Sequence, residues 1–150
     1  MEKEPFTAYQ FIGLMLFSAF VLFFFTFPVS GSYFWMILIV FLLSGSFIFW
    51  LLSTYTDPGY MNKHPKLKFL TLVERFDPSC LCPKCMVIWT PWSWHCNICD
   101  WCVERFDHHC PWINNCIGTN NHGYFLSFIL FLYFYLLMIT IFCTLKFESD

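Results

Sequence analysis

Three long apolar stretches divide the 150-residue sequence, and none of them contains a charged side chain. They cover residues 11–27, 34–52 and 124–145, which are 17, 19 and 22 residues long. A helix that crosses the hydrocarbon core of a bilayer needs about 20 residues, within a range of roughly 17 to 25. Strands of a membrane barrel alternate polar and apolar residues, and these stretches do not. The pattern therefore predicts an all-α membrane protein with three transmembrane helices.

The flanks of these stretches predict how the helices are threaded through the membrane. The N-terminal flank MEKEPF is acidic as well as basic, and no small-residue cleavage site precedes Pro28, so the first stretch is a retained helix and not a signal peptide. The short uncharged link over residues 28–33 joins the first two helices into a hairpin. The N-terminus and the long middle segment then share one face, and the C-terminal tail lies on the opposite face.

Charge distribution indicates which face is cytosolic. Six of the eight lysines and arginines lie in the middle segment, and the short link has none, so the positive-inside rule places the middle segment in the cytosol. Hydrophobic residues make up 58% of the chain and charged residues only 12%, far below the roughly 25% of soluble domains. The net charge is -2 without a basic run, which argues against a nucleic-acid partner.

Seven of the nine cysteines lie between residues 82 and 116. They form CxxC pairs, with two histidines among them: Cys82 with Cys85, Cys96 with Cys99, Cys99 with Cys102, and His95 and His109. The cytosol is reducing, so this density favours metal binding over disulfides, and a CxxC turn offers two thiolates suited to tetrahedral zinc. The alternative is a disulfide-linked lumenal loop, which requires the opposite orientation and leaves the histidines unexplained.

Counting ligands singles out one thiol. Without Cys110, the segment offers six cysteines and two histidines, enough for two closed four-coordinate zinc sites. Cys110 directly follows His108 and His109 and lies three residues after Asp107. A thiolate is the nucleophilic form of cysteine, an imidazole can take its proton, and a carboxylate can orient that imidazole. Spacing alone leaves open which histidine binds metal, and whether Cys110 is itself a zinc ligand.

The stretch from Cys82 to Phe125 closely resembles the cysteine-rich domain of the DHHC family of protein S-acyltransferases (palmitoyltransferases). The resemblance rests on the cysteine spacing, the tetrad of residues 107–110, the Pro-Trp that follows it, the NCIG sequence, Asn121 and Phe125. The sequence Asp57, Pro58, Gly59 matches the DPG motif of the family.

The resemblance implies how the ligands divide between two structural zinc ions. One ion takes Cys82, Cys85, His95 and Cys102, and the other takes Cys96, Cys99, His109 and Cys116. It also implies that Cys110 is the nucleophile, His108 the base and Asp107 the residue that orients it. The implied reaction moves a long-chain acyl group from acyl-CoA, typically palmitoyl-CoA, through an S-acyl-Cys110 intermediate to a cysteine of a membrane-associated substrate protein.

These observations predict three regions. Residues 1–56 hold the N-terminal tail and the transmembrane hairpin, with helices at about 11–27 and 34–52; residues 57–122 form a cytosolic, loop-rich segment whose two-zinc, cysteine-rich part covers 82–122; residues 123–150 hold the third helix and a short tail. The resemblance implies a multi-pass protein of an endomembrane (Golgi or ER) or the plasma membrane, with its active site on the cytosolic face. Its expected partners are acyl-CoA, cysteine-containing substrate proteins and the lipid bilayer.

The sequence departs from the family pattern in two respects. Trp89 and Trp92 stand where family members usually carry basic residues. Family members have a fourth helix followed by a TTxE motif, and the sequence stops after the third, which predicts a chain truncated after its third transmembrane helix. The alternative function is therefore a catalytically impaired or inactive zinc-binding membrane adaptor.

Overall fold

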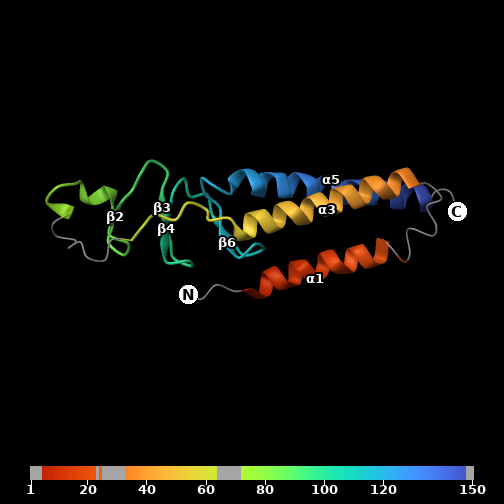
Figure 1. Ribbon diagram of the computed structural model, residues 1–150, viewed down its shortest axis with the longest axis horizontal. Coiled ribbons are helices and arrows are strands. Elements are labelled where there is room, and N and C mark those ends of the chain that lie inside the picture. Colours follow the sequence, from red (N-terminus) through yellow and green to blue (C-terminus); the bar gives the residue numbers. More distant parts are fainter. Residues whose placement is uncertain (1–4, 23, 25–32, 64–71, 148–150) are drawn as a thin grey trace.

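The computed structural model describes residues 5–22, 24, 33–63 and 72–147 (Figure 1). The described residues form three α-helices: α1 (Pro5–Val21), α3 (Tyr33–Tyr55) and α5 (His122–Phe147). Among the described residues, α3 and α5 are long and apolar enough to cross a bilayer, with mean hydropathies of 2.4 and 2.5. Helix α1 is apolar as well but has only 17 residues. The structure thus supports two of the three predicted spans, and the first span stays a prediction.

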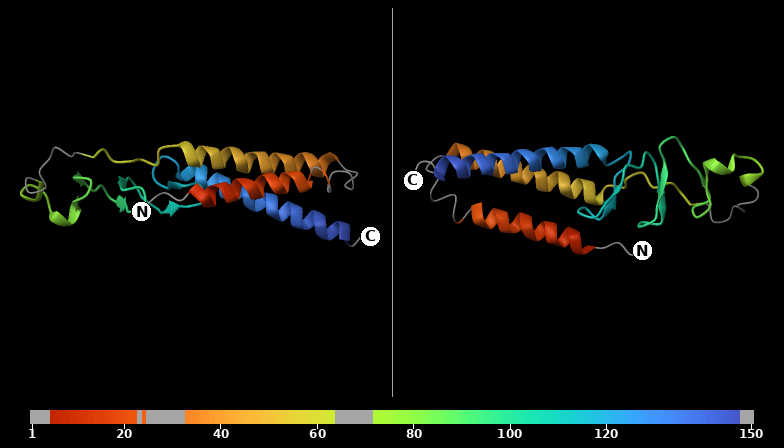
Figure 2. Two further views of the ribbon diagram at one scale, coloured as in Figure 1. Left: turned by 90° about the horizontal axis from the view of Figure 1, so that it is seen from below. Right: turned by 180° about the vertical axis from the view of Figure 1, so that it is seen from behind.

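The helices occupy one end of an elongated molecule, and the cysteine-rich segment (residues 82–122) extends from them toward the other end (Figure 1). The N-terminal end of α1, the C-terminal end of α3 and the N-terminal end of α5 all lie toward that segment, whereas the C-terminus lies at the far end of the helices (Figures 1 and 2). These positions of the helix ends are the ones expected for a chain that crosses a membrane three times in succession.

Helices α3 and α5 lie side by side and form the main helical contact (Figures 1 and 2). Gly45 of α3 lies directly against the ring of Phe131 of α5, and the rings of Phe49 and Phe131 are 5.4 Å apart between centroids. Helix α1 joins this pair through aromatic contacts of Phe11 and through a 3.0 Å hydrogen bond that Tyr135 Oη donates to Ser18 Oγ.

The helix bounds differ from the predicted ones for identifiable reasons. Helix α1 begins at Pro5 instead of residue 11, because proline suits the first helical position and the polar residues that follow it tolerate a helix. Its predicted end at residue 27 and most of the link over 28–33 lie outside the described residues. Helix α3 continues to Tyr55, beyond the predicted residue 52, since the hydroxyls of Ser53 and Thr54 bond to carbonyls one turn earlier. Helix α5 begins at His122, two residues before the apolar stretch.

The expectation of an all-α protein is wrong for the cysteine-rich segment. Six short strands pair there into three antiparallel hairpins: β1 (Leu81–Cys82) with β2 (Val87–Ile88), β3 (Trp94–Cys96) with β4 (Trp101–Val103), and β5 (His109–Cys110) with β6 (Asn115–Cys116). Strands of two or three residues carry too few alternating positions for a periodicity signal, which is why the sequence pattern indicated only loops.

The turns of the first two hairpins share one backbone geometry. In each, the residue after the second cysteine of a CxxC pair has a left-handed backbone, with φ of 55° at Met86 and 54° at Asp100. Non-glycine residues adopt this region rarely, and here it turns the chain back on itself directly behind the two sulfurs. The repeated CxxC sequence therefore builds the same turn twice.

Candidate metal centres and nucleophilic cysteine

The first group of metal-binding side chains combines a CxxC turn with a cross-strand pair. Cys82 and Cys85 come from the turn between β1 and β2, and His95 of β3 lies opposite Cys102 of β4 in the sheet register. The Nδ1 atom of His95 is 3.3 Å from the sulfur of Cys85, 3.6 Å from that of Cys82 and 3.7 Å from that of Cys102. All four residues are buried. Together they form a compact S₃N donor set.

The second group repeats this construction one hairpin later. Cys96 and Cys99 come from the turn between β3 and β4, and His109 of β5 lies opposite Cys116 of β6. The Nδ1 atom of His109 is 3.3 Å from the Cys99 sulfur and 3.6 Å from the Cys116 sulfur. Adjacent residues of a strand point to opposite faces, so His95 and Cys96 of β3 supply one donor to each group. The two groups are thereby interleaved along the chain.

The distances within both groups fit a four-coordinate metal ion. A tetrahedron with metal–sulfur bonds of about 2.3 Å and metal–nitrogen bonds of about 2.0 Å has nitrogen-to-sulfur edges of about 3.5 Å. The observed separations of 3.3–3.7 Å bracket that value. All donor atoms of each group lie within 4.8 Å of one another. Each group could therefore hold one metal ion.

The protonation behaviour of these side chains is compatible with metal binding. Burial lowers the pKa of His95, which favours the neutral imidazole that binds metals. A hydrogen bond with Cys116 lowers the pKa of Cys99 to about 3 and raises that of Cys116, because two crowded thiols share one proton. This sharing favours a thiolate in the second group.

Side chains around each group contact the donor atoms. Trp89 Nε1 donates to the Cys102 sulfur at 3.3 Å, and the Tyr60 hydroxyl donates to the Cys99 sulfur at 3.4 Å. The second nitrogen of His95, Nε2, lies 3.4 Å from the carboxylate of Asp100. Such outer contacts orient metal ligands and reduce the charge on thiolates.

Cys110 lies outside both groups. It neighbours His109 in β5, so the alternation along the strand directs its side chain away from the second group. The side chain is only 5% exposed and packs in one apolar cluster with residues from all three helices: Ala8 of α1, Trp50 of α3, and Phe128 of α5. The thiol therefore sits where the cysteine-rich segment meets the helices.

Asp107 and His108, the third and second residues before Cys110, contact each other. His108 Nδ1 lies 3.4 Å from Asp107 Oδ2, and the His108 ring packs edge-on against Phe125 at 5.3 Å between centroids. Phe125 in turn packs against the apolar cluster that contains Cys110. His122, at the start of α5, approaches the same Asp107 oxygen to 4.0 Å. The Asp107 carboxylate thus faces two imidazoles near the N-terminal end of α5.

Two features of its surroundings shift the pKa of the Cys110 thiol in opposite directions. Burial raises the pKa of the Cys110 thiol, whereas hydrogen bonds from the backbone amides of Ile113 and Trp112 oppose that rise. A buried thiol needs such donors and a nearby base to form a thiolate.

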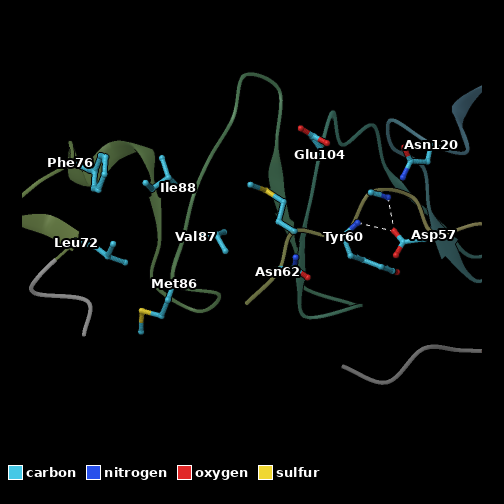
Figure 3. A pocket seen from close by; sticks show the side chains of 12 residues that line it. Asp57, Tyr60, Asn62, Leu72, Phe76, Met86, Val87, Ile88, Glu104 and Asn120 are labelled. Atoms are coloured by element: carbon cyan, nitrogen blue, oxygen red, sulfur yellow. Dashed lines mark hydrogen bonds between the residues drawn. The ribbon is translucent and has the colours of Figure 1, made fainter. Parts of the chain in front are cut away.

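A cavity of about 730 Å³ opens on a different part of the molecule (Figure 3). Apolar side chains line one end of it and polar side chains the other, as the labelled residues show: Leu72, Phe76, Met86 and Ile88 against Asp57, Glu104 and Asn120. The described lining does not include Asp107, His108 or Cys110. This cavity is therefore separate from the surroundings of Cys110.

Several residues of the site carry no signal that sequence reasoning could use. Trp89 stands out in the sequence only as a replaced basic residue, and its bond to Cys102 appears once the hairpins are folded. Tyr60 follows the DPG motif, whose Asp57 carboxylate accepts bonds from the amides of Gly59 and Tyr60 at 2.7 and 2.9 Å. Buried tryptophan and tyrosine side chains generally bond through their polar atoms, but the partner is not encoded by spacing.

Known proteins resemble this chain over the region that holds the site. The family model described as DHHC palmitoyltransferase matches residues 75–149, which is 75 of the 150 residues. Palmitoyltransferase Hip14 of Drosophila melanogaster is 42% identical over 101 residues, 61% of this chain and 16% of the relative. Palmitoyltransferase ZDHHC4 of Bos taurus is 41% identical over 102 residues, covering 65% of this chain and 30% of the relative. Human palmitoyltransferase ZDHHC17 is 39% identical over 87 residues, 55% of this chain and 14% of the relative.

The chain spans less than a third of the length of each of these curated relatives. The family match nevertheless covers half of the chain. It includes both metal-binding groups in full, since all eight of their side chains lie between residues 82 and 116. With its two long apolar helices, this match indicates a membrane protein. The chain belongs to the DHHC palmitoyltransferase family.

Proposed function

We propose that the chain acts as a protein S-acyltransferase, which moves a long-chain acyl group from acyl-CoA to a cysteine of a membrane-associated protein. The observation that carries this proposal is the position of Cys110. It is the buried cysteine outside both metal-binding groups, whereas Cys80 and Cys143 are exposed. It packs with residues of three apolar helices and follows His108, which contacts Asp107, by two positions. The names of the similar proteins, all palmitoyltransferases, support palmitoyl-CoA as the donor.

Two zinc ions are the metal ions we assign to the two groups. Three thiolates with one imidazole are a usual donor set of closed, structural zinc sites. The ligands would be Cys82, Cys85, His95 and Cys102 for one ion, and Cys96, Cys99, His109 and Cys116 for the other. When bound, the ions would hold the three hairpins in place, and the acyl-transfer chemistry would belong to the protein side chains alone.

His108 is the proposed base and Asp107 the residue that orients it. The contact between Asp107 Oδ2 and His108 Nδ1 favours the tautomer that carries a proton on Nδ1. Nε2 is then free to accept the proton of the Cys110 thiol. Residues two apart in an extended chain share a face, which places the His108 and Cys110 side chains on the same side of the chain leading into β5.

The proposed reaction has two balanced halves. The Cys110 sulfur attacks the thioester carbonyl of acyl-CoA after its proton passes to His108; a new C–S bond forms, the bond to the CoA sulfur breaks, and the CoA thiolate takes up the proton. A substrate cysteine then gives its proton to His108 and attacks the acyl group, and Cys110 leaves as a thiolate and regains that proton. One thioester replaces another in each half, so catalysis depends on activating and positioning sulfur.

The apolar cluster around Cys110 offers a place for the acyl chain. Ala8, Trp50 and Phe128 bring α1, α3 and α5 together at the sulfur. An acyl chain on Cys110 would extend along these helices, and each methylene removed from water contributes about 0.8 kcal/mol. The location of the nucleophile at the helix ends is thus suited to a lipid substrate.

We further propose that the cysteine-rich segment faces the cytosol on an endomembrane or the plasma membrane. The concentration of lysine and arginine between α3 and α5 supports this orientation. The substrate proteins would present a cysteine at that membrane face.

Labelled palmitoyl-CoA tests the function directly. The purified chain, loaded with zinc in detergent, should become labelled through a thioester that hydroxylamine removes, and Cys110→Ser should take up at least about 100-fold less label because it lacks the thiolate nucleophile. Cys143→Ser is the matched control, since Cys143 is an exposed cysteine of α5 outside both groups, and it should label like the wild type. Zinc content, measured by metal analysis, should be two per chain in all three proteins.

Three results would contradict parts of the proposal. Label that persists on Cys110→Ser would exclude Cys110 as the nucleophile. Absence of label on a wild-type chain with two zinc ions would favour a non-catalytic zinc-binding membrane adaptor. Loss of zinc from Cys110→Ser would show that Cys110 is a ligand.

A further inference from the structure

The turn that follows Cys110 is bound by two membrane helices. Residues 111–114 connect β5 to β6 as a turn in which the Asn114 amide donates to the Pro111 carbonyl at 3.2 Å. The hydroxyl of Thr7, in the first turns of α1, donates to the same carbonyl at 2.7 Å. The indole Nε1 of Trp50, near the end of α3, donates to the carbonyl of Trp112 at 3.1 Å.

These two carbonyls belong to the peptide groups that join Pro111 to Trp112 and Trp112 to Ile113, directly after Cys110. In a trans peptide the C=O and N–H bonds point in opposite directions. The Pro111 carbonyl shares a peptide group with the Trp112 amide, and the Trp112 carbonyl shares one with the Ile113 amide. No cis peptide occurs in the described chain. Binding both carbonyls therefore also fixes the direction of both N–H groups, and these are the two amides that oppose the rise in the pKa of Cys110.

This arrangement resembles a turn in which a side-chain acceptor bonds to the amides two and three residues further on. Here the acceptor is a sulfur that carries negative charge when it attacks an acyl group and again when it leaves. Donors fixed in advance around such a charge stabilise the transition state without having to reorient during the reaction. The carbonyls on the other side of these two peptide groups are bound by Thr7 and Trp50, which lie 104 and 62 residues away in the chain from their partners.

We propose that Thr7 and Trp50 are positioning residues for acyl transfer, which orient the two peptide groups after Cys110 by binding their carbonyl oxygens. This inference rests on the proposed function, because it takes Cys110 as the nucleophile. It assigns to α1 and α3 a role in the chemical step besides surrounding the acyl chain.

Thr7 offers the sharper test because one replacement removes its hydroxyl and another keeps it. Thr7→Val removes the hydroxyl at nearly constant volume, and Thr7→Ser keeps it. Self-acylation of the zinc-loaded chain by labelled palmitoyl-CoA is followed in single turnovers over a range of donor concentrations. We expect Thr7→Val to lower the rate at saturating donor by about three- to tenfold, the effect of one hydrogen bond, with the half-saturating concentration unchanged.

The controls separate positioning from general damage. Thr7→Ser should recover most of the wild-type rate. Thr140→Val makes the same chemical change at an exposed hydroxyl that bonds within α5, and it should not change the rate. Trp50→Phe keeps a ring in the apolar cluster without the N–H, and it should lower the saturating rate as Thr7→Val does. Zinc content and thermal unfolding are measured for each protein, so that a folding defect is recognised.

The outcomes distinguish this inference from the proposed function. Wild-type label that depends on Cys110, with an unchanged saturating rate in Thr7→Val, overturns the positioning role and leaves the function standing. Equal slowing in Thr7→Ser and Thr7→Val, or an effect confined to the half-saturating concentration, also overturns it. Absence of label on the wild type would contradict the proposed acyltransferase function itself.

Discussion

Asn115 shows how one side chain joins the cysteine-rich segment to a membrane helix. Its Nδ2 donates to three carbonyls at the C-terminal end of α3, at distances of 3.0–3.3 Å: those of Ser53, Thr54 and Thr56. The last carbonyls of a helix have no intrahelical donor, so a partner from elsewhere satisfies them. Its Oδ1 lies 3.2 Å from the Tyr60 hydroxyl and accepts from the Cys116 amide at 2.9 Å. A single buried amide therefore links α3, the DPG region and β6.

Replacing this amide should destabilise the protein. We expect Asn115→Leu to lower the free energy of unfolding by about 2–3 kcal/mol, because a buried polar group left without its partner costs roughly 1–3 kcal/mol. Unfolding of the zinc-loaded protein in detergent, followed by tryptophan fluorescence, measures the change. Asn120→Leu is the control: Asn120 is exposed, and its replacement should alter stability by less than about 0.5 kcal/mol. Equal losses in the two variants would show that the amide of Asn115 is not a special link.

At the scale of elements, the pairing of α3 with α5 depends on a small residue at their contact. A Cβ atom built on Gly45 collides with the ring of Phe131, whereas one built on Gly13 in α1 meets nothing within 4 Å. Helices without a polar interface approach closely only where side chains are small. Gly45 thus sets how near α5 can come.

The two glycines form a matched pair for experiment. Gly45→Val should destabilise the helical pair by about 1–3 kcal/mol through overpacking, and Gly13→Val should not, although both changes place valine in an apolar helix. Thermal unfolding of the two variants in the same detergent measures the difference. Similar melting temperatures for the two variants would mean that the contact at Phe131 adjusts without cost.

At the scale of the whole molecule, the cysteine-rich segment has little apolar core apart from its own metal-binding groups. One of its buried clusters consists of Val87 with three thiols of the first group: Cys82, Cys85 and Cys102. The other consists of Val103 with two thiols of the second group: Cys96 and Cys116. So small a core does not offset the entropy of ordering the hairpins, and we therefore expect their folding to depend on metal. The described contacts between α3 and α5 that involve Phe131 use apolar side chains and no metal-binding residue.

Metal removal should therefore unfold the cysteine-rich segment and leave the helices folded. We expect a strong chelator to speed amide hydrogen exchange in the six strands by at least about 100-fold, as in other small metal-stabilised modules, while exchange in the middle of α5 stays slow. Mass spectrometry of peptides from both regions measures this, and added zinc should restore the protection. Strands that stay protected in metal-free protein would contradict the dependence.

Some of this organisation was predictable because it depends on residue type and local spacing. Uncharged runs of helix-spanning length predicted α3 and α5, and cysteines three residues apart predicted the turns that present paired sulfurs. The hairpins escaped prediction, since strands of two residues leave no periodic pattern. The bond of Trp89 to a thiol escaped it too, because its partner lies 13 residues away across two turns.

The sequence by itself determined the candidates for the chemistry: eight potential metal donors, one further thiol between residues 82 and 116, an aspartate and a histidine before it, and apolar helices on both sides. The tertiary structure decided how they are combined. Strand alternation directs His109 into the second group and Cys110 toward the helices, and cross-strand pairing brings each histidine beside a cysteine. Thr7 and Trp50 reach the turn after Cys110 only because α1 begins and α3 ends beside it. Local spacing fixes which atoms a turn can present, but contacts between distant segments arise only when the chain is packed.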